Sequence, residues 1–220
     1  MNWIIAAAIA YVVGSIPFGL MIGLAKGIDI RDHGSKNIGA TNTGRVLGRS
    51  WGIICFFLDL LKGLAPVMAA GWYFGWLNTT VMTPSDAGKW LAVAIAAIMG
   101  HVFSCFLKFK GGKGVATGFG VILGIWPYLT LPAIGALITW VVVVLISKYV
   151  SLASIAASLG LPVYFVVVTQ FTDGSLSATW PFLAGTGLMA ILIVARHINN
   201  IQRLLRGEEN KISLGKKKDS

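Results

Sequence analysis

Six long apolar stretches, separated by short polar segments, constrain the fold of this chain more than any other feature. A helix needs roughly 20 apolar residues to cross the ~30 Å hydrocarbon core of a bilayer. Only 12% of the residues are charged and the mean hydropathy is +0.78, whereas soluble domains are typically about 25% charged. The sequence therefore predicts an all-α integral membrane protein. The stretches are Asn2–Ala25, Gly52–Trp76, Trp90–Leu107, Val115–Ile146, Leu152–Phe171 and Trp180–Ala195.

The chain shows no internal repeat, low-complexity segment or linker. We therefore expect one membrane domain over residues 1–220, in which residues 210–220 form a flexible basic tail. The first apolar stretch lacks a basic segment before it and is followed by further stretches, which favours a membrane helix over a cleaved signal peptide. The lysines at 216–218 can touch anionic lipid.

The fourth stretch, Val115–Ile146, is too long for one ordinary span, and Trp126-Pro127 and Pro132 lie near its middle. It is either a single long helix or a hairpin of two helices near 16 residues each. The hairpin places every Lys and Arg on one side of the membrane except Lys62 and Lys89. Because cations collect on the cytoplasmic side, we predict seven transmembrane helices, with the N-terminus outside and the C-terminus in the cytoplasm.

This topology brings three polar segments to the same membrane face. Gly34–Arg45 combines glycines, hydroxyls, amides and cations with no acid, which suits an anionic group. Lys108–Thr117 is a glycine-rich turn entering a helix, where free amides and the helix dipole attract anions. Arg196–Leu204 continues to Gly207-Glu208-Glu209. Each has an ordinary alternative: a solvated turn capping a helix, a positive-inside anchor, and an interfacial helix end.

Several polar residues fall inside the apolar stretches. Asp59 and Lys62 are three residues apart and can pair on one helix face, either to brace the neighbouring loop or to take part in catalysis. His101 is expected to have a satisfied hydrogen bond within the helix bundle. Cys55 and Cys105 both lie in apolar stretches, which favours buried hydrophobic residues over a disulfide or a metal site.

Three cationic segments at one membrane face indicate an anionic, phosphorylated ligand, and the surrounding helices indicate an apolar one such as an acyl chain. The net charge of +10 does not indicate nucleic acid, because the cations lie between membrane spans. The usual catalytic sets are missing: no His is followed by Asp five positions later, and there is no G-x-S-x-G elbow, metal-ligand spacing or true P-loop. The segments are rich in cations and poor in bases.

Three motifs resemble those of the bacterial acyl-phosphate:glycerol-3-phosphate acyltransferases. They are Gly-Ser-x-Asn-x-Gly-Ala-Thr-Asn-x-x-Arg at Gly34–Arg45, Lys-Gly-Gly-Lys-Gly-Val-Ala-Thr at Lys110–Thr117 and His-x-x-Asn-Ile-x-Arg-Leu at His197–Leu204. Gly14–Gly19, Asp59–Gly63 and Tyr149–Ser154 also resemble that family. The match runs the length of the chain in order, so it is far more specific than any single motif.

The resemblance implies a seven-helix enzyme of the bacterial inner membrane whose active site faces the cytoplasm. Such an enzyme transfers a fatty acyl group from acyl-phosphate to the sn-1 hydroxyl of glycerol 3-phosphate and yields lysophosphatidic acid, the first step toward phospholipid. The family's mechanism is substrate-assisted, and the resemblance implies no cofactor and no metal. The implied partners are glycerol 3-phosphate, acyl-phosphate, membrane lipids and a functional link to a soluble enzyme that forms acyl-phosphate.

By motif position, the resemblance assigns catalytic roles to Ser35, Arg45, Lys113, His197 and Asn200. Substrate contacts are expected from Thr41, Asn37, Asn42, Gly111, Gly112, Gly114 and Ser154. We expect Arg45 and Lys113 to hold phosphate oxygens, and the glycine amides with Ser35 to orient phosphate or carbonyl oxygen. Asn200 is expected to position the glycerol, and His197 to tie the last helix to a loop backbone.

The sequence departs from the family pattern at Lys36, where the family usually has glycine. This leaves open whether the backbone needs a positive φ there and whether Lys36 adds an anion contact. The alternative function is a transporter of a phosphorylated metabolite, which predicts charges along a transmembrane path and inverted repeats. A weaker alternative is a scaffold whose basic loops dock on anionic lipid.

Overall fold

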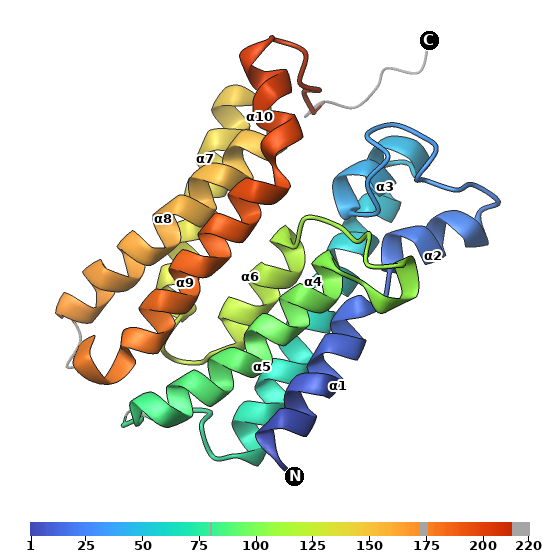
Figure 1. Cartoon of the computed structure of the whole chain (residues 1–220). Coiled ribbons are helices and arrows are strands. Elements are labelled where there is room, and N and C mark those ends of the chain that lie inside the picture. The colour runs from blue at the N-terminus through green and yellow to red at the C-terminus, as the bar shows by residue number, and fades with distance from the viewer. Residues whose placement is uncertain (80, 172–175, 213–220) are drawn as a thin grey trace.

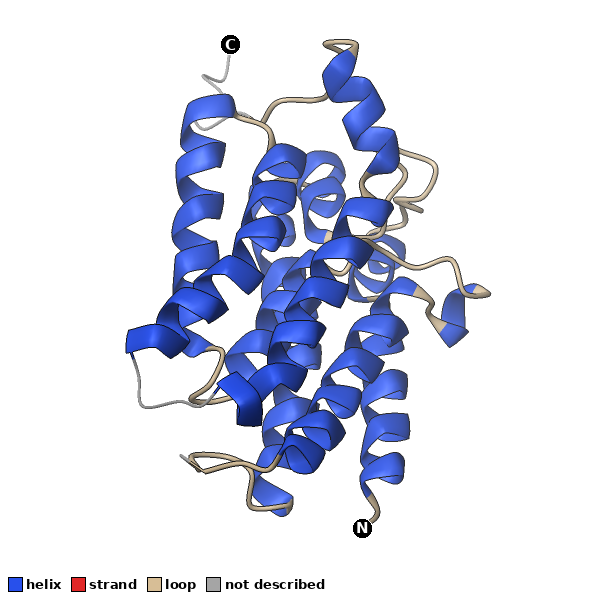
Figure 2. Ribbon diagram, turned by 60° about the vertical axis from the view of Figure 1, so that its left-hand side comes forward, coloured by secondary structure: helices blue, strands red, loops and turns tan. Residues whose placement is uncertain are grey.

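A computed structural model describes residues 1–79, 81–171 and 176–212, and every regular element within them is a helix (Figure 2). The elements are α1 (Trp3–Ser15), α2 (Phe18–Ala25), α3 (Ala40–Leu47), α4 (Arg49–Tyr73), α5 (Pro84–Val102), the 3-10 turn η1 (Cys105–Leu107), α6 (Val115–Gly124), α7 (Thr130–Ser147), α8 (Val150–Phe171), α9 (Leu176–Arg196) and α10 (Ile198–Leu205). The tail at 213–220 lies outside the described residues. The all-α membrane fold is confirmed.

Within the described residues, six helical segments are long and apolar enough to cross a membrane. The fourth apolar stretch is divided, as the hairpin predicts, into α6 and α7, and the chain turns back between them (Figure 1). The two lengths differ from the expected 16 each, because α6 has 10 residues and α7 has 18. At 1.5 Å per residue, α6 covers only about 15 Å, about half of a hydrocarbon core. The seven-span count therefore stays a prediction.

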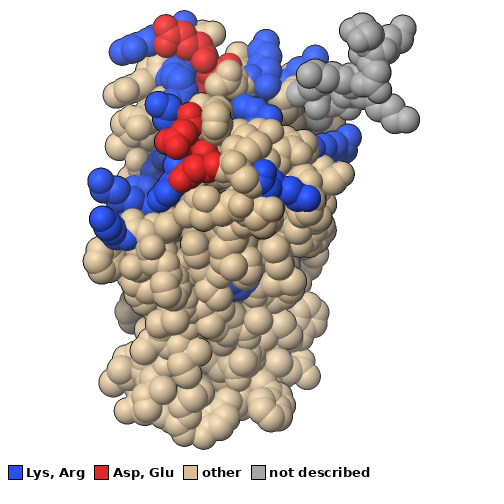
Figure 3. All heavy atoms as spheres, turned by 90° about the vertical axis from the view of Figure 1, so that its right-hand side faces the viewer, with Lys and Arg blue, Asp and Glu red and all other residues tan. Residues whose placement is uncertain are grey.

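Charged residues gather at one end of the molecule. Figure 3 shows Lys, Arg, Asp and Glu side chains crowded at the end that carries the C-terminal region, while the rest of that face is almost free of charge. The N-terminus lies at the opposite end (Figure 1). The orientation of the chain in the membrane stays a prediction, and we refer below to the charged end as the cationic end.

The first apolar stretch is interrupted between α1 and α2. Ile16 has left the helical region (ψ 118°) because it precedes Pro17, so carbonyls at the end of α1 lose their helical donors. Two side chains replace those donors: Ser104 Oγ donates to Ser15 O at 2.6 Å, and Lys62 Nζ donates to Ile16 O at 2.6 Å. In a bilayer, freed carbonyls need such partners.

The predicted pairing of Asp59 and Lys62 is confirmed, with Lys62 Nζ 2.7 Å from Asp59 Oδ1 and both side chains buried. Because Lys62 also holds Ile16 O, the contacts of the pair brace the bend that turns α2 away from α1. His101 differs from expectation, since its Nδ1 has no hydrogen-bond partner among the described residues and lies 3.9 Å from Asp59 Oδ1. Cys105 also differs: it is exposed, because α5 ends before it, whereas Cys55 is buried.

Small residues set the spacing of the helices at the centre of the bundle. A Cβ on Gly120 of α6 would lie 2.0 Å from Leu60 O, and one on Gly63 of α4 would lie 2.2 Å from Thr117 O. Such close backbone approach is typical of membrane helix pairs. It fixes α6 against α4 and thereby fixes the place where α6 begins.

A matched pair of glycine substitutions tests this packing. Gly120→Ala should lower the free energy of unfolding by about 1–3 kcal/mol, because the added methyl group overpacks a backbone contact. Gly187→Ala in α9 should be neutral or stabilising by up to ~1 kcal/mol, because its Cβ meets nothing within 4 Å and alanine favours helix. Thermal unfolding midpoints in detergent measure both, and equal midpoints would contradict the packing.

Candidate functional site

A cavity of about 140 Å³ opens among residues of α3, α4, α5, α6, α7, α8, α10 and the loops between them. Ten of the twelve residues that the sequence assigns to the site line it, although they come from segments far apart in the chain. They are Ser35, Asn37, Thr41, Asn42, Arg45, Lys113, Gly114, Ser154, His197 and Asn200. The three polar segments therefore meet in one place, as the predicted topology requires.

The loop before α3 is held in shape by Asn42, which is 1% exposed. Its Oδ1 accepts from the backbone N–H of Ser35 at 2.7 Å, and its Nδ2 donates to Ile30 O at 2.9 Å and His33 O at 3.1 Å. These three hydrogen bonds hold the loop in one conformation beside the cavity. In this structure the Asn42 side chain therefore stabilises the loop conformation that places Ser35 at the cavity.

Lys36 adopts a left-handed backbone conformation, with φ 57°. Glycine reaches this region without strain, whereas other residues do so at a cost of about 1 kcal/mol or more. The backbone there does need a positive φ, which answers the question raised by the family's glycine. The Lys36 side chain is exposed and lies outside the cavity lining.

Two helices begin at the cavity wall. Gly39, Ala40 and Thr41 line it at the start of α3, and Gly114, Val115 and Ala116 line it at the start of α6. The first amides of a helix have no partner within the helix, and the helix dipole places partial positive charge there. Arg45 lies on α3, four residues after Thr41, and makes no ion pair with an acid among the described residues. Within the described residues, free helix amides together with an unpaired guanidinium form a wall whose charge suits an anion.

The glycine-rich turn before α6 corrects one expectation. Gly111 N–H donates to Val102 O and Gly112 N–H donates to His101 O, each at 3.0 Å. These amides dock the turn on the end of α5, so they are not free donors, and neither glycine lines the cavity. A Cβ would lie 2.0 Å from His101 O at Gly111 and 2.2 Å from His101 Nε2 at Gly112, which explains why glycine suits both positions.

Lys113 follows this turn and extends into the cavity. Its Nζ donates to Asn200 Oδ1 at 2.5 Å, and Asn200 is itself 5% exposed. Burial, together with the charges of Arg203, Arg45 and Arg196, lowers the pKa of Lys113 to about 8. The lysine therefore still carries its charge at neutral pH, and it loses that charge as the pH rises through about 8.

His197 sits at the corner between α9 and α10 and is 2% exposed. Its Nδ1 lies 2.7 Å from Ile193 O. Since a carbonyl only accepts, Nδ1 carries the proton and Nε2 is left as the acceptor. The bond is to the end of α9, the helix that His197 follows, and not to a loop backbone as expected. Burial and the nearby charge of Lys113 lower the pKa of His197 to about 4, which makes it neutral and weakly basic.

Glu209 lines the cavity, and the sequence did not assign it to the site. Its Oε1 accepts from Asn200 Nδ2 at 2.6 Å and from Ser151 Oγ at 2.8 Å, and its Oε2 accepts from Arg203 Nε at 2.7 Å. Burial alone raises the pKa of this carboxyl, but these donors outweigh burial and lower the pKa. The available signal was an acid directly after the third cationic segment, in a chain with only 8 acids.

A sequence profile described as glycerol-3-phosphate acyltransferase matches residues 4–207. The glycerol-3-phosphate acyltransferase of Geobacter sulfurreducens is 42% identical over 213 residues, which are 96% of this chain and 98% of that protein. The chain belongs to this family. Two crystal structures of PlsY (YgiH), an integral membrane glycerol 3-phosphate acyltransferase, are also similar. The glycerol 3-phosphate form has a TM-score of 0.83 and 36% identity over 96% of both chains. The lysophosphatidic acid form has a TM-score of 0.80 and 35% identity, over 96% of this chain and 95% of that one.

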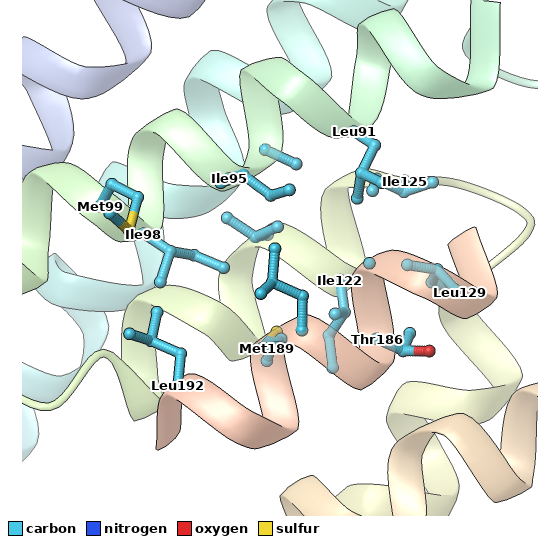
Figure 4. A pocket seen from close by; sticks show the side chains of 14 residues that line it. Leu91, Ile95, Ile98, Met99, Ile122, Ile125, Leu129, Thr186, Met189 and Leu192 are labelled. Atoms are coloured by element: carbon cyan, nitrogen blue, oxygen red, sulfur yellow. The ribbon is translucent and has the colours of Figure 1, made fainter. Parts of the chain in front are cut away.

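The acyltransferase also has an apolar cavity of about 250 Å³ between α5, α6 and α9 (Figure 4). Side chains such as Ile98, Ile122 and Met189 point into it, and the Thr186 hydroxyl donates to Leu183 O in its own helix. An apolar cavity of about 150 Å³ is enough to stay dry and bind benzene, so this lining suits hydrocarbon. It does not suit glycerol 3-phosphate, which leaves the polar cavity as the candidate active site.

Removing the Asn42 amide tests how the loop is held. Asn42→Ala leaves the buried Ile30 carbonyl without a donor, a loss of about 1–3 kcal/mol, and should speed hydrogen exchange in the 26–39 segment by about tenfold or more. Asn37→Ala is the control, because within the described part of the chain its Oδ1 accepts from Gly39 N–H alone. Exchange mass spectrometry measures both variants, and unchanged protection in Asn42→Ala would contradict the role assigned to Asn42.

Proposed function

We propose that this chain transfers a fatty acyl group from acyl-phosphate to the sn-1 hydroxyl of glycerol 3-phosphate, giving lysophosphatidic acid by a substrate-assisted reaction. Family membership supports a glycerol-3-phosphate acyltransferase and argues against the transporter alternative. The observation that carries the finer proposal is the composition of the polar cavity. It joins cations and two helix starts to polar groups whose basic atoms are engaged or weak. Asp59 is paired with Lys62 and lies beside the buried His101, Glu209 accepts three hydrogen bonds, and His197 has a pKa of about 4.

The phosphate of glycerol 3-phosphate would lie between Arg45, Lys113 and the first amides of α3 and α6. An arginine fork can engage two phosphate oxygens, and a lysine adds a point charge. The two similar crystal structures, one of a glycerol 3-phosphate form and one of a lysophosphatidic acid form, support a site for these ligands in this fold. Ser35 and Asn200, at the same cavity, are proposed to orient the ligand.

The proton acceptor is proposed to be a phosphate oxygen of the substrates. His197 has a pKa of about 4, and its neutral Nε2 can accept a hydrogen bond from the glycerol hydroxyl without removing its proton at neutral pH. Glu209 is held by three donors, which stabilise its charge and weaken it as a base. The remaining proton acceptors are the phosphate oxygens of the two bound substrates.

The reaction then needs positioning more than activation. The hydroxyl oxygen attacks the acyl carbonyl carbon, the bond from that carbon to the phosphate oxygen breaks, and the proton passes to a phosphate oxygen. The products are the sn-1 ester and inorganic phosphate. Acyl-phosphate already has a good leaving group, so cations that hold both ligands and donors aimed at the developing oxyanion supply the remaining acceleration. Phe56 and Trp140 give the same cavity apolar walls for the acyl end.

The cationic end is proposed to face the cytoplasm of a bacterial cell, with the chain in the inner membrane. Support comes from the collection of Lys and Arg at that end (Figure 3) and from the positive-inside tendency. On that side the site can receive glycerol 3-phosphate from the cytoplasm. It can also receive acyl-phosphate from a soluble enzyme that makes it.

The direct test is a reaction with purified protein, acyl-phosphate and labelled glycerol 3-phosphate. We expect lysophosphatidic acid to form without CoA, and we expect Arg45→Ala or Lys113→Ala to lower kcat/KM for glycerol 3-phosphate by about a hundredfold, since each removes a charged hydrogen bond. Acyl-CoA and acyl-carrier protein serve as control donors. Turnover with either of these and none with acyl-phosphate would overturn the proposed donor.

The pH dependence tests Lys113 separately. Because only its protonated form binds phosphate, kcat/KM for glycerol 3-phosphate should fall above pH ~8, approaching tenfold per pH unit. Lys113→Arg keeps its charge at all accessible pH values, so its alkaline limb should move to higher pH. An identical alkaline limb in both proteins would show that Lys113 is not the titrating group.

A further inference from the structure

Arg196 lies at the last position of α9, next to His197, yet it is absent from the lining of the polar cavity. Its guanidinium faces the turn before α6. Nε donates to Gly112 O at 3.2 Å and Nη2 donates to Gly111 O at 3.2 Å. The group also lies over the ring of Phe103, 6.0 Å from its centroid. Two of its donors are engaged and one of its faces is covered, so the Arg196 guanidinium is occupied by contacts within the protein.

The turn is held from two sides. On one side the amides of Gly111 and Gly112 bond to carbonyls at the end of α5. On the other side the carbonyls of the same residues accept from Arg196. A rigid planar fork that engages two successive carbonyls fixes the orientation of both peptide groups, which a single ammonium cannot do.

The next residue along the chain is Lys113, whose Nζ bonds back to Asn200. Asn200 is four residues after Arg196, on the other side of the α9–α10 corner. The turn and this corner are therefore joined twice, through the backbone by Arg196 and through a side chain by Lys113. Gly114, which follows with φ 83°, caps α6 and sets the direction of its first amides.

We propose that Arg196 is a positioning residue: by clamping the carbonyls of Gly111 and Gly112, it sets where Lys113 and the start of α6 meet the phosphate, without touching the substrate. This inference rests on the proposed role of Lys113 in holding phosphate. It predicts that Arg196 affects the affinity for glycerol 3-phosphate and that the effect passes through Lys113.

The test is a double-mutant cycle on Arg196→Lys and Lys113→Ala, with kcat and KM for glycerol 3-phosphate measured in lysophosphatidic acid formation. Arg196→Lys keeps the charge and loses the fork. It should raise KM about tenfold, as expected for coupled neighbours, with kcat within about twofold because the loss is of uniform binding. In the Lys113→Ala background, the same substitution should change kcat/KM by less than about twofold.

The control is Arg206→Lys, an exposed cation at the end of α10 that lies outside the cavity lining; it should leave both constants unchanged. Two results would overturn the inference: a wild-type KM in Arg196→Lys, or an equal tenfold effect in both backgrounds. If Lys113→Ala turns over too slowly, the same cycle is read from glycerol 3-phosphate dissociation constants by calorimetry. An inactive wild type would instead contradict the proposed function, so the two failures are distinguishable.

Discussion

The hydrogen bond between Lys113 and Asn200 joins two halves of the site, and the geometry of the polar cavity depends on it. Lys113 belongs to the turn that begins α6, whereas Asn200 belongs to the corner after α9. Asn200 passes the connection to Glu209, which also holds Arg203 and Ser151. Through this chain of bonds, a cation taken partly out of water keeps its charge balanced without a direct carboxylate partner. Its remaining hydrogens stay available to a ligand.

The membrane explains why the supporting contacts look as they do. Inside a bilayer each freed carbonyl must find a donor within the protein. The bend at Pro17 is therefore stabilised by Lys62 and Ser104. The close approach of α4 and α6, made by Gly63 and Gly120, then sets the depth at which α6 begins. The polar cavity lies at that depth, at the end of the molecule where charged side chains gather (Figure 3).

The sequence predicted the class of fold because apolar length is a strong local signal, and it predicted most of the residues that meet at the cavity through the three motifs that resemble the family. The length of an apolar stretch predicts a membrane span, and the distribution of Lys and Arg predicts which loops lie on the same side of the membrane. Details that depend on tertiary contacts were not predictable. Spacing alone could not show that the amides of Gly111 and Gly112 bond to the end of α5, or that His197 bonds to the end of α9. Glu209 was missed for the same reason, since its three donors come from α8 and α10.

The central claim is that glycerol 3-phosphate binds with its phosphate between Lys113, Arg45 and the starts of α3 and α6. A crystal structure of this chain with glycerol 3-phosphate bound tests it most directly. The account predicts phosphate oxygens within about 3 Å of Lys113 Nζ and of the Arg45 guanidinium, with the sn-1 hydroxyl near His197. A phosphate bound on the exposed cations Arg31 or Lys36, with the cavity unoccupied by ligand, would contradict it.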